Sequence, residues 1–252
     1  MKRTISFLLL VSLFVALPVR ADVSVAVGSE HFFWEEMDPV GGGRLLDETG
    51  WRHFVAVTGS MPLRNGWRIG GMGKVYGGDV NYDGQLNNGT PYSTTTEYRG
   101  VNGELLFSRS AQEVADSHTD FELGMGLDDW SRDLVGPYGY VEDYQVFYGR
   151  IGINHQRKTG WRVRAGLLLP FQVKEHVNLY DGFALEPQGR LSLYAACGYQ
   201  FATNWELSLD FSTYRFDQSD PVRVYSHGVY VGSYLQPESH QTTTSLVLGY
   251  RF

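Results

Sequence analysis

The 252-residue chain contains a single cysteine, Cys197, so no disulfide within the chain can hold its fold. Charged residues make up only 19% of the chain, below the usual quarter. After residue 21, no apolar run approaches the roughly 18 residues that a membrane-spanning helix needs. Linkers, low-complexity segments and shifts in composition are also missing. These absences exclude a disulfide scaffold and a helical membrane protein, and they favour a single domain.

The N-terminus has the pattern of a secretory signal peptide. Lys2 and Arg3 precede an apolar stretch from Ile5 to Leu17, and Val19-Arg20-Ala21 places small residues at the −3 and −1 positions of a cleavage site. We expect residues 1–21 to be removed after export and residues 22–252 to form the mature domain. Removal leaves 18 basic and 28 acidic residues, a formal charge of −10, which argues against a nucleic-acid partner.

Alternating side chains predict strands along the mature chain. Odd-numbered residues from Trp161 to Val173 are apolar, whereas Arg162, Arg164 and Lys174 lie on the opposite face. A period of two over this length indicates a strand with two different faces. Ten such segments are expected, within a range of eight to twelve: about 22–35, 51–63, 67–82, 97–108, 119–130, 143–156, 161–175, 189–201, 205–216 and 241–252.

The connections between these segments differ in length. Those near 64–66, 157–160 and 202–204 are tight, the one near 109–118 is longer, and those near 36–50, 83–96, 131–142, 176–188 and 217–240 are long and polar. Short turns at one rim and long loops at the other are typical of a transmembrane antiparallel up-and-down β-barrel. Alternation alone leaves open a soluble periplasmic ligand-binding barrel, which would keep its apolar face inside.

Aromatic residues gather at the expected strand ends. Trp67, Trp161 and Trp205 each follow a tight turn, and the half-apolar ring of tryptophan belongs at a membrane–water boundary. We expect these three residues, with Tyr250 and Phe252, to anchor the barrel at one interface. A second girdle is expected from residues near the other strand ends: Tyr76, Tyr82, Tyr98, Tyr138, Tyr140, Tyr144, Tyr180 and Phe183.

The end of the chain resembles the bacterial outer-membrane β-barrel superfamily. Thr244, Leu246, Leu248 and Tyr250 share one face, and the aromatic Phe252 closes the strand as the last residue. The resemblance implies a place in the cell outer membrane, in contact with its lipid. It also implies insertion by the barrel-assembly machinery, which reads such a last strand, but it implies no activity.

Charges of both signs lie on the predicted inward face. Burying them costs several kcal/mol each unless they pair, so a nearly balanced set predicts a salt-bridged lumen, with a narrow pore as the alternative. The set comprises Glu30, Arg68, Lys74, Glu104, Glu122, Asp128, Arg150, Arg162, Arg164, Arg190, Glu206, Asp210 and Arg251.

One candidate for chemistry lies at the rim of the long loops. The predicted barrel is similar in size to the omptin proteases, outer-membrane barrels that pair two acidic residues with an Asp–His couple at the extracellular mouth. Asp128 and Asp129 end one predicted strand there, and His176 follows Glu175 at the end of another. A histidine oriented by a carboxylate can activate water, although the Asp-x-His spacing is absent. Asp128, Asp129 and His176 are therefore the candidates for an omptin-like hydrolase.

Asp79, Asn81 and Asp83, followed by Gly84, match the first half of a calcium loop, in which oxygen ligands occupy alternate positions. The closing glutamate is missing, because the twelfth position is Thr90. No other cofactor is expected. The sequence therefore favours a non-enzymatic integral outer-membrane protein whose barrel anchors long acidic extracellular loops around a mostly plugged lumen.

Overall fold

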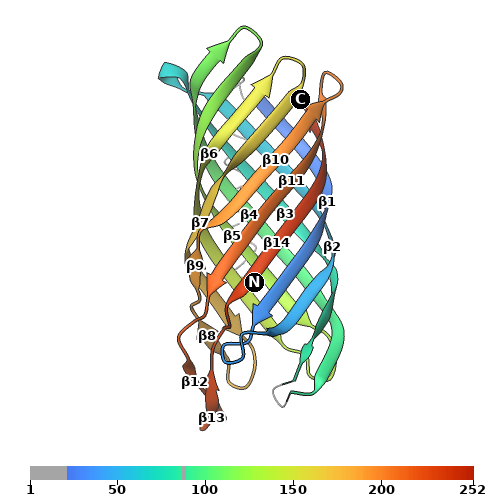
Figure 1. Cartoon of the computed structure of the whole chain (residues 1–252), viewed down its shortest axis with the longest axis vertical. Coiled ribbons are helices and arrows are strands. Elements are labelled where there is room, and N and C mark those ends of the chain that lie inside the picture. The colour runs from blue at the N-terminus through green and yellow to red at the C-terminus, as the bar shows by residue number, and fades with distance from the viewer. Residues whose placement is uncertain (1–21, 87–88) are drawn as a thin grey trace.

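The computed structural model describes residues 22–86 and 89–252, and the expected signal peptide lies outside them. Ten long antiparallel strands form a closed barrel (Figure 1), as the sequence predicts. Around the wall they are β1 (Asp22–Met37), β2 (Arg44–Pro62), β3 (Trp67–Gln85), β4 (Pro91–Val114), β5 (Ser117–Leu134), β6 (Val141–Arg157), β7 (Trp161–Val177), β10 (Ser192–Gln200), β11 (Trp205–Asp217) and β14 (Ser239–Arg251). The barrel closes because β10 pairs with both β7 and β11, while β14 joins β11 to β1. Within the described residues, no helix is long and apolar enough to cross a membrane.

One end of the barrel, the turn end, carries the short connections. They are residues 63–66, 115–116, 158–160 and 201–204. Asn65 and Gly66 have φ values of 60° and 75°, which asparagine and glycine adopt more readily than other residues in a tight turn. The connection expected near 109–118 is a two-residue turn, because β4 and β5 both extend further than their apolar residues indicate.

The connections at the opposite end, which we call the loop end, contradict the prediction of five long loops. The connections at 38–43, 86–90 and 135–140 are short, because the flanking strands run on into the predicted loops. Two connections are long. One contains β8 (Phe183–Leu185) and β9 (Gln188–Arg190), and the other forms a hairpin of β12 (Val222–Ser226) and β13 (Val229–Tyr234). Acidic residues assigned to loops, such as Glu48, Asp133 and Glu142, therefore belong to the barrel wall.

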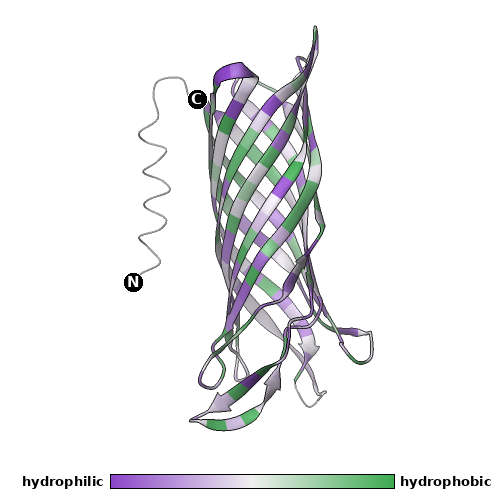
Figure 2. Cartoon of the chain, turned by 90° about the vertical axis from the view of Figure 1, so that its left-hand side faces the viewer, coloured by the Kyte–Doolittle hydropathy of each residue, from purple (hydrophilic) through white to green (hydrophobic). Residues whose placement is uncertain are grey.

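The outside of the turn-end half is apolar, and residues of opposite character alternate along the strands (Figure 2). On β7 the exposed apolar positions run from Trp161 to Phe171. These ten residue steps span about 33 Å along the strand, and about 25 Å of membrane at a tilt near 40°. On β5 the exposed Phe121, Leu123 and Met125 give way to polar outward positions at Asp129 and Ser131. The barrel wall thus continues beyond its apolar band.

A β-bulge in β7 corrects the predicted face of its last residues. Tyr148 of β6 lies opposite Pro170 and Phe147 lies opposite Gln172, so Phe171 is an extra residue in β7. An extra residue shifts every later side chain to the other face. Val173, expected outside, is therefore 4% exposed in the interior, whereas Lys174, expected inside, is exposed.

Glycines inside the barrel make room for tyrosine rings from neighbouring strands. A Cβ on Gly126 would lie 2.3 Å from the ring of Tyr148, which is 3% exposed. Gly126→Ala is expected to lower the free energy of unfolding by about 1–3 kcal/mol, the usual cost of overpacking. Urea unfolding in detergent micelles measures this change. Gly149→Ala is the control, because its Cβ would meet nothing closer than 3.9 Å, and an equal loss in both variants would contradict the steric explanation.

Candidate functional site

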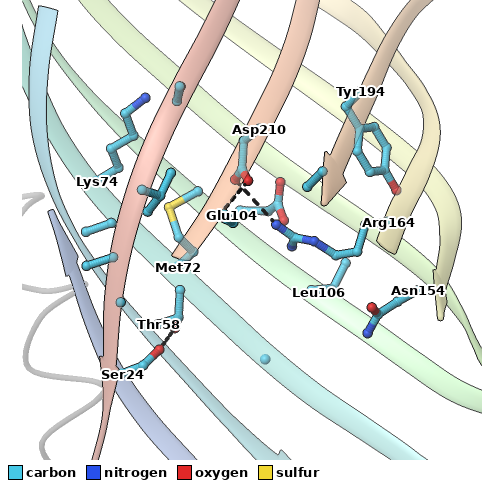
Figure 3. Close-up of a pocket in the computed structure, with 18 of the residues that line it drawn as sticks. Ser24, Thr58, Met72, Lys74, Glu104, Leu106, Asn154, Arg164, Tyr194 and Asp210 are labelled. Atoms are coloured by element: carbon cyan, nitrogen blue, oxygen red, sulfur yellow. Dashed lines mark hydrogen bonds and ion pairs between the residues drawn. The ribbon is translucent and has the colours of Figure 1, made fainter. Parts of the chain in front are cut away.

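A cavity of about 760 Å³ occupies the turn-end half of the barrel interior (Figure 3). Its wall begins at the rim, where the paired Asp22 and Arg68 side chains are 60% and 42% exposed. Its inner end, toward the loop end of the barrel, includes Tyr76, Tyr148 and Tyr214, all buried. The cavity therefore reaches solvent at the turn end and stops about halfway along the barrel.

Most of the charges expected in the lumen line this cavity. Arg150 bridges Glu104 and Glu122, each at 3.0 Å. Arg162 pairs with Glu206, and Arg164 lies 3.7 Å from Asp210. The residues of the expected set that line the cavity are Arg68, Lys74, Glu104, Glu122, Asp128, Arg150, Arg162, Arg164, Glu206, Asp210 and Arg251. Because positive and negative side chains pair here, they form a structural network, and this set does not present unpaired charges of a single sign.

Two members of the expected set lie elsewhere. Glu30 does not line the cavity. It is completely buried and accepts hydrogen bonds from Arg52 and Lys74, which do line it. Arg190 is not in the lumen: it is half exposed at the loop end and pairs with Asp217 and Glu238. Its expected position is wrong because the strand is irregular at Leu191, between β9 and β10.

Polar contacts hold together the side chains at the inner end of the cavity. Asp128 is buried and accepts hydrogen bonds from the hydroxyls of Tyr76, at 2.8 Å, and Tyr214, at 3.3 Å. Beside them the guanidinium of Arg52 lies 4.0 Å from the ring centre of Phe32, within reach of a cation–π interaction. Asp128 thus joins three strands from inside the barrel.

Between the inner end of the cavity and the loop end of the barrel, aromatic side chains fill the interior. Trp130 stacks on Tyr144 at 4.9 Å with an interplanar angle of 7°, and it also stacks on Tyr214 at 6.3 Å. We call this group the aromatic layer; each of its members is at most 3% exposed, and they are Phe32, Trp34, Tyr98, Trp130, Tyr144 and Phe216.

An ionic cluster centred on Arg132 completes the filling. Its guanidinium pairs with Glu36 at 3.2 Å, with Glu48 at 3.0 Å and with Glu142, and all four side chains are at most 8% exposed. Glu48 also accepts hydrogen bonds from the hydroxyls of Thr96 and Tyr98. We call these four charged residues the Arg132 cluster, and together with the aromatic layer they form the plug.

The sequence predicts a mostly plugged lumen, but sequence reasoning missed the residues of this plug because it assigned Glu36, Glu48, Arg132 and Glu142 to loops. It also placed four tyrosines on the outside, namely Tyr76, Tyr82, Tyr98 and Tyr144. All four are at most 8% exposed in the interior. The signal was available, because Lys74 was assigned to the inward face and Tyr76 and Tyr82 share its parity on β3.

Comparison with known proteins identifies the fold. No protein-family model and no curated protein sequence matches the chain. Among solved structures, the outer membrane protease OmpT from Escherichia coli is 14% identical, with a TM-score of 0.57 over 92% of this chain and 96% of that chain. The chain has the fold of a bacterial outer-membrane β-barrel. The translocator domain of the autotransporter NalP from Neisseria meningitidis is 10% identical, with a TM-score of 0.45 over 100% of this chain and 95% of that chain.

The residues expected to anchor the outer-membrane barrel lie together at its turn end. Trp205 packs edge-on against Tyr250, and Tyr250 packs against Phe252. Trp161 contacts Tyr199, and the ring of Trp67 lies 5.6 Å from the guanidinium of Arg109. Partly exposed aromatic rings at one rim are suited to the interface between lipid and water.

The three catalytic candidates do not converge in the barrel. Asp128 points into the interior, where two tyrosines use its oxygens. Asp129 faces outward and accepts a hydrogen bond from Gln145 at 3.2 Å. His176 is exposed on β7, opposite Asp143 of β6. No interaction links these three candidates to one another within the described residues. The wall separates Asp128 from the other two, and on the outside Asp129 lies opposite Gln145 of β6 whereas His176 lies opposite Asp143.

The calcium candidate does not form a loop. Asp79, Asn81 and Asp83 lie on the straight strand β3, with exposed side chains on the outside of the barrel. Four residues of strand separate Asp79 from Asp83 by about 13 Å. Among the described residues, no group of three histidine, cysteine or acidic side chains could hold a metal ion.

A carboxylate fastens the β12–β13 hairpin to the neighbouring loop. His227 and Gly228, with φ values of 52° and 78°, form the two-residue turn of the hairpin. Their backbone N–H groups donate to the side chain of Asp181, at 3.0 Å and 3.2 Å. These hydrogen bonds lower the pKa of Asp181 below its ordinary value.

The lowered pKa gives the hairpin a defined dependence on pH. The stabilisation is complete above the unfolded pKa of aspartate, about 3.9, and is lost as pH falls through the lower folded pKa. In a His227→Asn background, which removes the neighbouring imidazole, the amide NMR shift of Gly228 is therefore expected to stay constant from neutral pH down to about pH 4 and to change below it. Asp181→Asn in the same background is expected to shift this amide at every pH. A titration of the Gly228 amide centred above pH 4 in the His227→Asn protein would contradict this account.

Proposed function

We propose that this chain is a non-enzymatic integral protein of the cell outer membrane whose lumen is closed to passage. Residues 1–21 would direct its export, and the barrel-assembly machinery would insert it through the strand that ends at Phe252. The observation that carries the proposal is the plug. Its ionic and aromatic side chains are buried at one level of a barrel only slightly wider than the eight-stranded kind that side chains fill.

The closed barrel would serve as a rigid anchor for a surface-exposed module. The β12–β13 hairpin extends from the loop end (Figure 1), and its Val229 and Tyr230 are 66% and 54% exposed. Short turns face the periplasm in bacterial barrels, so the hairpin would face the outside of the cell. A surface, adhesion or structural role fits this arrangement better than a narrow pore, and no calcium is required for it.

Planar-bilayer recording tests the closed lumen. The purified barrel is expected to insert and to carry no current, although it migrates as a heat-modifiable band that requires detergent. Steady ohmic steps from the wild-type protein would overturn the closed lumen. A detergent-independent particle would instead support the soluble alternative, in which the apolar face lies inside.

The likeness to a protease structure keeps a second candidate, an outer-membrane hydrolase with a rim active site. The separation of Asp128 from Asp129 and His176 favours the non-enzymatic role. We expect no cleavage of peptides that contain basic residues. Cleavage that Asp129→Asn or His176→Ala abolishes, and that a surface variant such as Arg44→Gln retains, would establish the hydrolase and overturn the proposal.

A further inference from the structure

The part of the cavity wall that β4, β5 and β6 form carries more acidic than basic residues. Glu104, Asp120, Glu122 and Asp128 line it, whereas Arg150 supplies the one guanidinium group of these strands in the described part of the chain. That single guanidinium is shared between Glu104 and Glu122. This part of the wall therefore favours a ligand group with a positive charge.

Asp120 is the carboxylate of this wall with the weakest support from its neighbours. The residue is only 9% exposed, and its partner is the half-exposed His118, whose Nε2 atom lies 3.8 Å away. Among the described residues, its side chain accepts no hydrogen bond and meets no lysine or arginine. Burial of a carboxylate is costly unless a partner compensates it. An ammonium group of a ligand would supply that partner.

Asp120 begins a row of polar side chains across three strands. It lies opposite Asn154 of β6, and Asn154 lies opposite Arg164 of β7. All three residues line the cavity, and Figure 3 shows Asn154 and Arg164 among them. Residues directly opposite each other on one face of a sheet have Cβ atoms about 5 Å apart. A carboxylate, an amide and a guanidinium group therefore lie in this order, and we call them the polar row.

Two atoms of the polar row are buried without a hydrogen-bond partner among the described residues, namely Asn154 Oδ1 and Arg164 Nε. The acid nearest to Arg164 is Asp210, whose carboxylate lies 3.7 Å away, too far for a hydrogen bond. An amide oxygen accepts a hydrogen bond, and a guanidinium N–H group donates most strongly to a carboxylate. The polar row thus offers acceptors at one end and a donor for a carboxylate at the other.

The polar row is accessible from the turn end. Asp120 and Asn154 lie within four residues of the turns at 115–116 and 158–160. His118 and Gln156, which come before them along the wall, also line the cavity, and the His118 side chain is 42% exposed. The volume of about 760 Å³ is within the range of small-molecule sites. A polar ligand can therefore reach the row without passing the plug.

We propose that the polar row binds a basic α-amino acid that enters the cavity from the turn end. An α-amino acid carries its carboxylate and its ammonium group on one carbon atom, which suits neighbouring side chains of opposite character. Its carboxylate accepts from Arg164 Nε, and its α-ammonium group donates to Asn154 Oδ1 and to Asp120. Its side-chain ammonium group lies against Glu122, which is the next inward residue of β5 and shares Arg150 with Glu104. This site goes beyond the anchoring role and leaves the lumen closed.

Titration calorimetry tests the amino-acid site on the wild-type barrel in detergent micelles at physiological ionic strength. L-lysine is the probe and is expected to give saturable heat. Cadaverine, which lacks the carboxylate, and L-norleucine, which lacks the side-chain ammonium group, are each expected to bind at least about tenfold more weakly, the usual effect of losing a hydrogen bond between charged groups. The absence of saturable heat from L-lysine would overturn the site and would leave water as the partner of these atoms. Equal affinity for cadaverine would overturn the carboxylate contact, and equal affinity for L-norleucine would overturn the preference for a basic side chain.

Two variants test the position of the site. Arg164→Met and Asp120→Asn are each expected to weaken L-lysine binding on the order of tenfold to a hundredfold. Arg68→Met is the matched control, because Arg68 lines the same cavity but pairs with Asp22 at the rim, and it is expected to keep the wild-type affinity. Heat-modifiable migration shows that each variant is folded. Wild-type affinity in Arg164→Met and Asp120→Asn would overturn the position of the site. Bilayer current and peptide cleavage take no part in these readouts, so the proposed function stands or fails separately.

Discussion

Replacing Arg132 with methionine is expected to lower the free energy of unfolding by about 3–5 kcal/mol, the usual cost of removing one partner from a buried ion pair. The Arg132 guanidinium is the positive charge of its cluster, and methionine leaves the carboxylates of Glu36, Glu48 and Glu142 together in a dry interior. Urea unfolding of the barrel in detergent micelles, followed by tryptophan fluorescence, measures the loss.

Two controls separate the buried cluster from charge removal in general. Arg68→Met breaks a pair with Asp22 whose side chains are well exposed, so a loss below about 1 kcal/mol is expected. Adding Glu48→Gln and Glu142→Gln to Arg132→Met is expected to recover part of the stability, because the unpaired charges are removed. Equal losses for Arg132→Met and Arg68→Met, or no recovery, would show that the cluster carries no special energetic role.

Trp130→Ala is expected to cost about 3–5 kcal/mol, as large-to-small changes of buried aromatic residues do. Trp130 lies between Tyr214, which lines the cavity, and Tyr144, which belongs to the aromatic layer. Its removal therefore extends the cavity into the plug. Unfolding in urea measures the first effect, and bilayer recording is expected to show brief current steps that the wild type lacks.

Trp51→Ala is the matched control for Trp130→Ala. Trp51 is 56% exposed on the outside of β2, where it packs against His31. Its loss should leave the current at zero and cost much less stability, because no interior volume is created. Current steps from Trp51→Ala would contradict the assigned position of the plug. So would a Trp130→Ala variant that carries no current and unfolds at the same urea concentration as the wild type.

The fold was predictable where the barrel wall faces lipid. There the outward face is apolar and the inward face polar, as on β5, where Leu123 and Met125 alternate with Glu122 and Gly124. The tight turns and the tryptophans that follow them could also be read from the sequence. The closed barrel of ten strands follows from these signals alone.

The plug was not predictable from the same rule, because the rule reverses beyond the apolar band. On β6 the inward Tyr144 and Val146 are apolar, whereas the outward Asp143 and Gln145 are polar. An interpretation that assigns apolar residues to the outside therefore misplaces the tyrosines and treats charged residues as loops. The bulge in β7 adds a second error. Its signal in the sequence is Pro170, because a proline inside a strand is typical of an edge or a bulge, and the prediction did not use it.

The level of the plug has a consequence for the response of the barrel to its membrane. Trp130 and Arg132 lie beside the outward polar residues Asp129, Ser131 and Asp133, beyond the apolar band. A thinner or thicker bilayer changes the match at that band and can tilt the barrel. The plug lies beyond the level of the hydrocarbon, so its packing depends on the protein alone. We therefore expect this packing to be the same in membranes of different lipid composition.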